Sequence, residues 1–237
     1  EKILRIKGSK DNYVIESGIT PSGMIHAGNF REVITADLIR RALNKRGKKV
    51  TFLYVWDDYD VLRKVPVNLP KQEMIKENLR KPVFKVPDPY GCHQSYAEHS
   101  EKVFEDESKL TGIEATFVYS HENYLRCMYA KEIKTALEAT DKIKEILNEF
   151  RREPLADDWL PIFVFCEKCN RDTIKEINWS TGYEINYKCE CGHQDTIDFR
   201  KKGLVTLRWR VDWPMRFHKN QVDFETAGKD HFAAGGS

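Results

Sequence analysis

Two apolar segments joined by an amphipathic one open the chain. Residues 12–19, NYVIESGI, combine β-branched and aromatic side chains and end in glycine, which predicts a strand. Residues 29–49 predict a helix, because Val33, Ile34, Ala36, Ile39, Ala42 and Leu43 lie near helical spacing on one side. Residues 49–58 are apolar almost throughout and predict a second, buried strand. Strand, helix and strand with short links imply a parallel pair and a right-handed crossover, so we expect an α/β fold with a doubly wound parallel sheet.

Further along, the pattern changes twice. Residues 61–91 are rich in loops and proline, residues 95–112 predict a helix, residues 113–120 a third strand, and residues 129–152 one long charged helix. From Pro154 to about Lys202 the chain becomes rich in Cys, Asn, Asp, Thr and aromatic residues with short strands. Residues 203–214 then return to strand character. We therefore expect the first half of the α/β domain in 1–153, an inserted module in 154–202, and the start of the second half in 203–237.

Composition excludes some classes of protein. The chain has 237 residues, 41% hydrophobic and 32% charged, as in ordinary soluble globular proteins. No apolar run approaches the roughly 20 residues of a membrane helix, and the N-terminus has no secretory apolar core, so we expect a cytoplasmic protein with no membrane partner. The formal net charge of +2, from 39 basic and 37 acidic residues, neither indicates nucleic-acid binding nor excludes a local basic face.

The stretch GITPSGMIHAGNF, residues 18–30, joins the first predicted strand to its helix. Such a turn lies at the carboxyl edge of the sheet, where ligands collect in open α/β folds. The free N–H groups and the dipole of the helix suit a phosphate, and glycine lets the backbone and a ligand approach closely. The turn therefore predicts a nucleotide phosphate site, although it matches neither G-x-x-x-x-G-K-[ST] nor G-x-G-x-x-G.

Four of the six cysteines form two close pairs, CEKC at 166–169 and CECGH at 189–193. In a chain without a signal peptide this spacing favours a structural zinc ribbon over disulfides. Cys166, Cys169 and Cys189 are the expected ligands, and the fourth is either Cys191 or His193. The alternative is a set of reduced, unligated cysteines in a β-rich insertion.

A second set of potential metal ligands lies in PDPYGCHQSYAEH, residues 87–99. A helix beginning near Gly91 would place Cys92 and His99 on one face, seven residues apart. Together with Asp88 and His93 they would make a tetrahedral set. Otherwise His99 is an ordinary helix residue, and His93 is catalytic or lies at the surface.

The segment PSGMIHAGN resembles the HIGH motif of class I aminoacyl-tRNA synthetases, in the form found in the class I lysyl-tRNA synthetases. His26 stands in the place of the first histidine, Gly28 in that of the glycine and Asn29 in that of the second histidine, while Ala27 replaces the usual isoleucine. The further segments WDDYD, VPDPYGCHQSYAEH, RWRVDWPMRF and GKDHFAAGGS also agree with this family, in order along nearly the whole chain. The resemblance implies a Rossmann-like catalytic domain.

That resemblance also implies roles for individual residues. The ATP-binding residues would be Pro21, Ser22, Gly23, His26, Gly28 and Asn29. Of these, His26 and Asn29 would be catalytic, because donors placed at the α-phosphate stabilise the extra charge of the pentacoordinate transition state. The substrate-binding residues would be Gly18, Thr20, Asp57, Asp58, Trp213, Asp230 and His231. Asp57 or Asp58 would hold the α-amino group, although an aspartate is more often a helix cap or a surface ion-pair partner, and Trp213 is as often plain core packing.

The reaction that the family implies is activation of lysine by ATP, with Mg²⁺, to lysyl-adenylate, followed by transfer to tRNA(Lys). The second family motif, KMSKS, does not occur in residues 1–237 and lies further along the chain in the family. We therefore expect these residues to be the N-terminal part of a longer protein, and this part to be nearly inactive by itself. We expect the longer protein to be a monomer. The second metal site is also expected from the family. Alternatives are a glutamyl-type synthetase, a zinc-dependent RNA-binding module without catalysis, and another nucleotidyltransferase.

Overall fold

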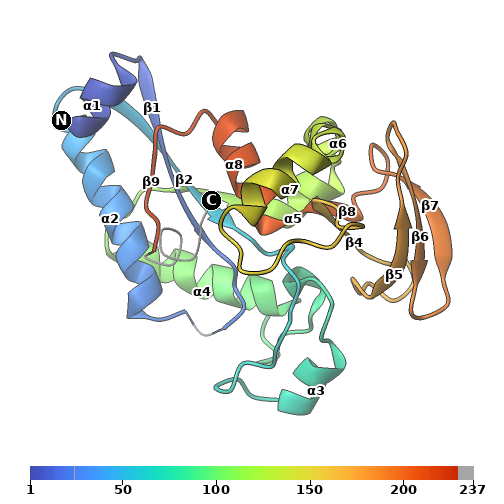
Figure 1. The fold of residues 1–237 in the computed structure, drawn as a ribbon. Coiled ribbons are helices and arrows are strands. Elements are labelled where there is room, and N and C mark those ends of the chain that lie inside the picture. Colours follow the sequence, from blue (N-terminus) through green and yellow to red (C-terminus); the bar gives the residue numbers. More distant parts are fainter. Residues whose placement is uncertain (24, 229–237) are drawn as a thin grey trace.

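The computed structural model describes residues 1–23 and 25–228, and its centre is a four-stranded parallel sheet in the order β3-β2-β1-β9 (Figure 1). The strands are β1 (Asn12–Ile19), β2 (Lys49–Trp56), β3 (Thr116–Tyr119) and β9 (Phe224–Glu225). β1 and β2 pair over their whole length, from Asn12 opposite Lys49 to Ile19 opposite Trp56. The predicted parallel α/β sheet is confirmed.

Helices cover both faces of this sheet. Helix α2 (Ala27–Asn44) and helix α4 (Tyr96–Leu110) bury Val33, Ala36, Leu43 and Phe104 against one face, where alternate residues of β1 and β2 point. The same core holds Tyr13 and Ile15 of β1 and Phe52, Tyr54 and Trp56 of β2. Helix α8 (Trp209–Lys219) lies on the other face, where Asn220, just after it, donates a hydrogen bond to Glu16 of β1.

Two predicted elements differ from the structure. The long helix expected over 129–152 is two helices, α6 (Ala130–Glu138) and α7 (Thr140–Asn148), with Ala139 ending one and capping the next. The strand expected over 203–214 is only β8 (Val205–Leu207), after which α8 begins at Trp209. Alternating apolar and charged residues in LRWRVDW imitate a strand, but here Asp212 and Arg216 are one helical turn apart and face the same way.

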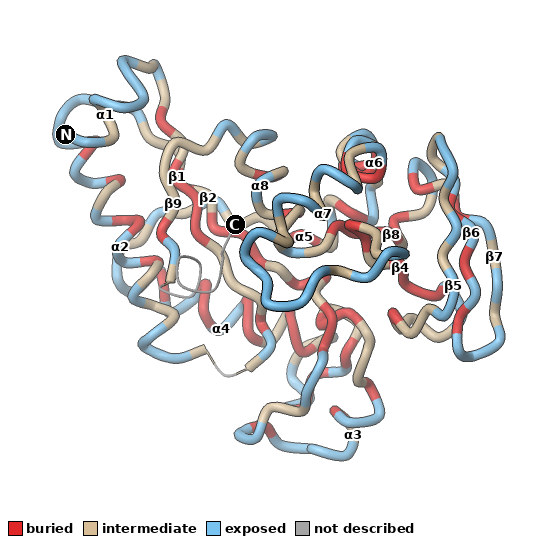
Figure 2. Tube along the Cα trace, viewed as in Figure 1, coloured by how far each residue is buried: buried red, intermediate tan, exposed pale blue. Residues whose placement is uncertain are grey.

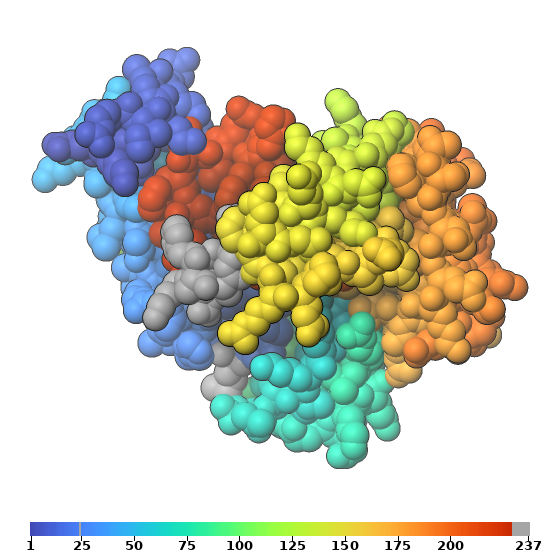
Figure 3. Space-filling model, viewed as in Figure 1, coloured from blue at the N-terminus to red at the C-terminus, as the bar shows by residue number. Residues whose placement is uncertain are grey.

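The cysteine-rich region forms its own sheet. Strands β5 (Ile174–Asn178), β6 (Glu184–Cys189) and β7 (Gln194–Asp198) are antiparallel neighbours in that order. Strand β4 (Ile162–Val164) instead pairs with β8, so the start of the predicted module 154–202 is bonded to the chain that follows it. Figure 3 shows this module at one end of the molecule and the N-terminal residues at the other. The domain boundaries themselves stay predictions.

The remaining elements connect these parts. They are α1 (Lys2–Lys7), α3 (Gln72–Glu77), the 3₁₀ helix η1 (Val83–Lys85) and α5 (Ser120–Leu125). Buried positions concentrate in the strands and the inner sides of the helices (Figure 2). Among the described residues, no helix combines the length and apolar character needed to cross a membrane.

Candidate active site

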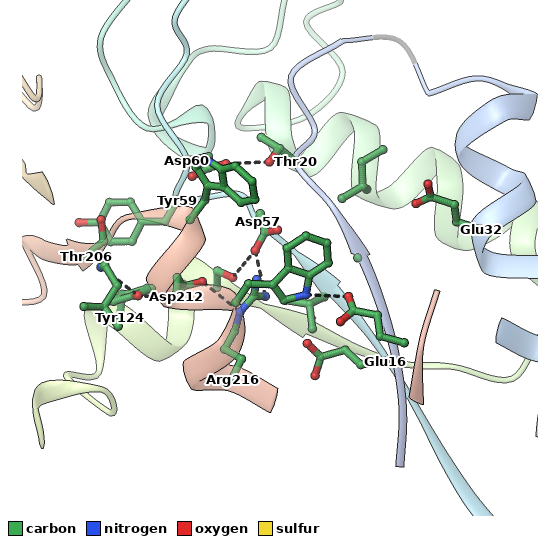
Figure 4. Close-up of a pocket in the computed structure, with 18 residues that line it drawn as sticks. Glu16, Thr20, Glu32, Asp57, Tyr59, Asp60, Tyr124, Thr206, Asp212 and Arg216 are labelled. Carbon is green, nitrogen blue, oxygen red and sulfur yellow. Dashed lines mark hydrogen bonds and ion pairs between the residues drawn. The ribbon is translucent and has the colours of Figure 1, made fainter. Parts of the chain in front are cut away.

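A cavity of about 280 Å³ opens at the carboxyl ends of β1 and β2, between the sheet and α8 (Figure 4). Six of its lining side chains are carboxylates: Glu16, Glu32, Asp57, Asp60, Asp212 and Glu225. Among the described lining residues the one guanidinium or ammonium group is that of Arg216. The aromatic part of the wall includes Tyr59, Trp209 and Trp213. A cavity with this surplus of acidic over basic side chains is suited to a cationic ligand.

Arg216 is buried and pairs with two of these carboxylates. Its Nη1 atom lies 2.9 Å from Oδ1 of Asp57, and its Nε atom lies 3.0 Å from Oδ2 of Asp212. Tyr124 also donates a hydrogen bond to Asp212 and accepts one from the backbone N–H of Leu207. Although burial disfavours the charged guanidinium, the carboxylates outweigh it and raise the pKa of Arg216. Arg216 therefore joins Asp57 and Asp212 in one buried ion-pair network.

The predicted substrate residues Gly18, Thr20, Asp57 and Trp213 all line this cavity. A Cβ atom on Gly18 would lie 2.6 Å from the carbonyl oxygen of Val55, so only glycine permits β1 and β2 to approach this closely here. Thr20 donates a hydrogen bond of 2.7 Å to Asp60. Burial, with the charge of Asp57, raises the pKa of Asp60 to about 7.

Asp58 is not among the residues that line the cavity. It is fully buried on the other side of β2, where it accepts hydrogen bonds from the backbone N–H and the imidazole of His121. Asp57, which lines the cavity, is therefore the better placed of the two predicted aspartates. The predicted residues Asp230 and His231 lie outside the described residues.

The predicted phosphate turn ends in a reciprocal cap on α2. The Nδ1 atom of His26 accepts a hydrogen bond of 3.1 Å from the N–H of Gly28, and Asn29 Oδ1 accepts one of 3.2 Å from the N–H of His26. This capping box satisfies N–H groups that have no partner inside the helix. Accepting at Nδ1 leaves the proton of a neutral imidazole on Nε2. His26 is thus both a helix cap and a side chain with a remaining N–H donor.

Gly28 makes room for that imidazole. A Cβ atom at this position would lie 2.8 Å from Cε1 of the His26 ring. A larger residue would therefore displace the ring from its cap. None of Pro21, Ser22, Gly23, His26, Gly28 and Asn29 lines the acidic cavity, although Thr20, directly before them, does. The turn and the cavity are thus adjoining parts of one edge of the sheet.

Four cysteine sulfurs meet at the base of the module. Those of Cys166, Cys169, Cys189 and Cys191 lie within 4.8 Å of one another. The pairs 166–191 and 169–189 are 3.7 and 3.6 Å apart. Four sulfurs placed about 2.3 Å from one zinc ion would be separated by about 3.8 Å, so the cluster has the dimensions of a Cys₄ zinc site.

His193, the alternative fourth ligand, belongs to a different group. It lies with Glu167 and Asp195, and Lys202 already donates to both of those carboxylates, at 2.7 and 3.2 Å. Cys191 is therefore the residue that the structure brings to the other three cysteines.

The second predicted ligand set is also brought together. Sγ of Cys92 lies 3.1 Å from Nδ1 of His93, 3.2 Å from Nδ1 of His99 and 3.4 Å from Oδ2 of Asp88. The helix begins at Tyr96 and not near Gly91, so the expected helical register is wrong, and Cys92 reaches His99 from the preceding loop. Backbone N–H groups of Tyr90, His93 and Cys92 outweigh desolvation and hold the pKa of Asp88 down at about 2. Two nitrogens, one sulfur and one carboxylate make a donor set that suits zinc.

Comparison with known proteins agrees with this geometry. The family described as tRNA synthetases class I (K) matches residues 1–237. The chain belongs to this family. Its lysine–tRNA ligase relatives include those of Borrelia garinii subsp. bavariensis, 48% identical over 237 residues, and Pyrococcus horikoshii, 49% identical over 241. That of Methanocaldococcus jannaschii is 44% identical over 229 residues.

These relatives are longer proteins. The alignments cover 96–100% of this chain but 43–46% of the relatives' own lengths, so the chain spans about half of the synthetases it matches. The family nevertheless accounts for both the parallel sheet and the turn at its edge.

Sequence reasoning missed most of the residues that line the cavity, among them Glu16, Arg216 and Glu225. Glu16 carries a signal that was available, because a lone carboxylate inside the apolar strand NYVIESGI is costly unless it has a function. Arg216 and Glu225 carried no comparable signal. Their place depends on α8 and β9, neither of which the alternation of residues predicted.

Proposed function

We propose that the protein carrying this chain is a lysine–tRNA ligase, which activates lysine with ATP and transfers it to tRNA(Lys). The observation that carries the proposal is the acidic cavity beside the His26 turn. Its six carboxylates face one arginine, so an amino acid with two ammonium groups gains by entering it. The lysine–tRNA ligase relatives support the same substrate.

In this mechanism the two halves of the site have separate tasks. Asp57, which is paired with Arg216, accepts hydrogen bonds from the α-ammonium group of lysine. Trp213 packs against the aliphatic part of the lysine side chain. Nε2–H of His26 and the side-chain N–H of Asn29 would donate to phosphate oxygens, with the positive end of the α2 dipole behind them. ATP brings Mg²⁺, and attack of the lysine carboxylate on the α-phosphate releases pyrophosphate. Such donors stabilise the negative charge that builds up at the phosphorus.

The charge of the cavity argues against a glutamyl-type synthetase. A glutamate side chain would add another carboxylate to a lining that already holds six. A like charge in a buried site is repelled, whereas an ammonium group is attracted. The RNA-binding alternative leaves the acidic cavity without a task, since RNA is itself an anion.

Zinc is proposed at both cysteine-containing clusters. The Cys₄ cluster would join the chain segments at the base of β5–β7 and stabilise the module, as closed zinc sites do. The Asp88, Cys92, His93 and His99 cluster would fix the loop before α4. Metal analysis should find two zinc ions per chain, and His99→Ala should remove one of them. Cytoplasmic location and the monomeric state stay predictions.

Pyrophosphate exchange tests the proposal. The protein carrying this chain is incubated with ATP, labelled pyrophosphate and each amino acid in turn. Lysine should promote exchange and glutamate should not. Exchange with glutamate would move the assignment to the glutamyl type, and RNA binding without ATP binding would favour the non-catalytic module.

A further inference from the structure

Two glutamates stand side by side on neighbouring strands in the lining of the cavity. Glu16 of β1 is in register with Glu225 of β9 in a parallel pair. Residues in register on adjacent strands, about 4.8 Å apart, project from the same face of the sheet. Both side chains line the acidic cavity, and Figure 4 shows Glu16 beside Arg216 there.

Each carboxylate has one hydrogen-bonded oxygen and one buried oxygen without a partner among the described residues. Oε2 of Glu16 accepts from Asn220 at 3.0 Å, and Oε1 of Glu225 accepts from the indole of Trp213 at 2.7 Å. Oε1 of Glu16 and Oε2 of Glu225 are the two that remain. Glu16 is only 1% exposed. An unpaired buried carboxylate is costly, so each oxygen requires a proton or a cation.

No cation among the described residues forms an ion pair with either carboxylate, although the charge of Arg216 acts to lower the pKa of both. Arg216 is committed to Asp57 and Asp212, which lie on the same side of the sheet and repel further negative charge. Tyr129 is near enough for the charge of Glu16 to act on its pKa, and it offers no positive charge. Burial raises the pKa of Glu16, although Arg216 and Asn220 act in the opposite direction. Burial and the charge of Glu16 raise the pKa of Glu225 to about 9.

We infer that Glu16 and Glu225 hold one proton between them in the ligand-free protein and release it when a primary ammonium group of the substrate binds. This inference rests on the proposed function, because it takes the ligand of the cavity to be an amino acid with two such groups. An ammonium carries three N–H donors, so one group can bond to both unpaired oxygens at once. The displaced proton passes to the solvent, and no covalent bond changes.

This exchange makes substrate binding selective for positive charge. A substrate with a neutral side chain would leave the carboxyl pair protonated and would gain no binding free energy from it. An anionic side chain would meet Asp57 and Asp212 without displacing the proton. Lysine instead gains two charge-assisted hydrogen bonds, at the cost of one proton lost to solvent.

Calorimetry measures the exchange directly. Lysine is titrated into the protein carrying this chain at pH 7 in phosphate and in Tris, whose ionisation enthalpies differ, and the difference in heat gives the number of protons released. We expect close to one proton per lysine, and a dissociation constant that falls by up to tenfold per unit rise in pH below the pKa of the pair. Two analogues then show which ammonium group of lysine displaces the proton. Norleucine lacks the ε-amino group, and 6-aminohexanoate lacks the α-amino group.

Two nearly isosteric variants and a control complete the test. Glu225→Gln and Glu16→Gln should each abolish most of the proton release, weaken lysine binding at least tenfold and flatten its dependence on pH. Glu138→Gln, at an exposed ion pair on α6, should behave as the wild type. Circular dichroism establishes whether each variant is folded. If one of the two glutamine variants is misfolded, the other one carries the test.

The outcomes separate the inference from the function. Lysine binding with the same proton release in the wild type and in either folded variant would overturn the exchange while leaving the ligase assignment intact. Absence of lysine binding by the wild type would overturn both.

Discussion

Arg216 on α8 and Asp57 at the end of β2 form an ion pair of 2.9 Å at the centre of the acidic cavity. The pair joins a helix on one face of the sheet to the end of a strand beside the cavity. Asp212, one helical turn before Arg216, completes the contact at 3.0 Å. The cavity therefore depends on the guanidinium of Arg216, a residue that is far from the glycine turn in the sequence.

Replacing that cation should destabilise the protein. Arg216→Met leaves Asp57 and Asp212 buried without a positive partner, and breaking a buried ion pair costs about 3–5 kcal/mol. Urea unfolding should show this loss, whereas Lys134→Met at the exposed Lys134–Glu138 pair should cost less than about 1 kcal/mol. Equal, small losses in both variants would show that Arg216 does not hold the site together.

Glu101 should make stability depend on pH. Burial, followed by the charges of Asp58 and Glu105, raises its pKa to about 9. The folded state then binds the proton more tightly than the unfolded state, so this contribution is complete below about pH 4.5 and is lost as the pH rises towards 9. Glu101→Gln keeps a neutral side chain at every pH.

Thermal unfolding of that variant from pH 5 to 9 checks the sign. The advantage of Glu101→Gln over the wild type should grow as the pH rises, while Glu107→Gln, at an exposed position on the same helix, should run parallel to the wild type. Curves for Glu101→Gln that stay parallel to the wild type would contradict the raised pKa.

The sequence predicted the fold best where periodicity is strong. The strands over 12–19 and 49–58, and the helix between them, lie within a few residues of β1, β2 and α2, because their apolar residues face one core. The same reasoning failed over 203–214, where α8 carries Pro214 within it and alternates apolar with charged residues. The secondary structure of that segment depends on the tertiary contacts of Asp212 and Arg216. The alternation of apolar and charged residues along the chain carries no information about those contacts.

For the site, spacing was most informative where ligands are close in sequence. The cysteine pairs predicted the Cys₄ cluster, but only the folded chain distinguishes Cys191 from His193. Glu225 illustrates the opposite case. It reaches Glu16 across more than two hundred residues by strand pairing, and no local pattern indicates such a contact.

The metal clusters give a paired prediction. Cys191→Ser should abolish zinc binding at the proposed Cys₄ site and unfold the β5–β7 module, because closed zinc sites supply much of the folding free energy of small domains. His193→Ala should keep the metal, since its ring lies with Glu167 and Asp195. Zinc content and thermal unfolding measure both. Loss of zinc in the histidine variant with retention in the cysteine variant would reverse the ligand assignment.

His26 should have two separable contributions. His26→Ala loses the cap on α2, which costs about 1 kcal/mol of stability, and the Nε2–H donor, which costs about 10²–10³-fold in lysine-dependent pyrophosphate exchange. His26→Asn restores a side-chain oxygen that can cap the helix but brings no imidazole. It should therefore recover stability and not activity. Recovery of exchange in His26→Asn would reduce the role of His26 to capping.

The most direct test of the whole account is a crystal structure of the protein carrying this chain with a non-hydrolysable lysyl-adenylate analogue. We predict that the lysyl group fills the cavity lined by Glu16, Asp57 and Trp213, and that the linkage replacing the phosphate lies at the start of α2 within hydrogen-bond distance of His26. Density for the analogue at another place, with the acidic cavity and the turn at 18–30 both free of it, would contradict the account.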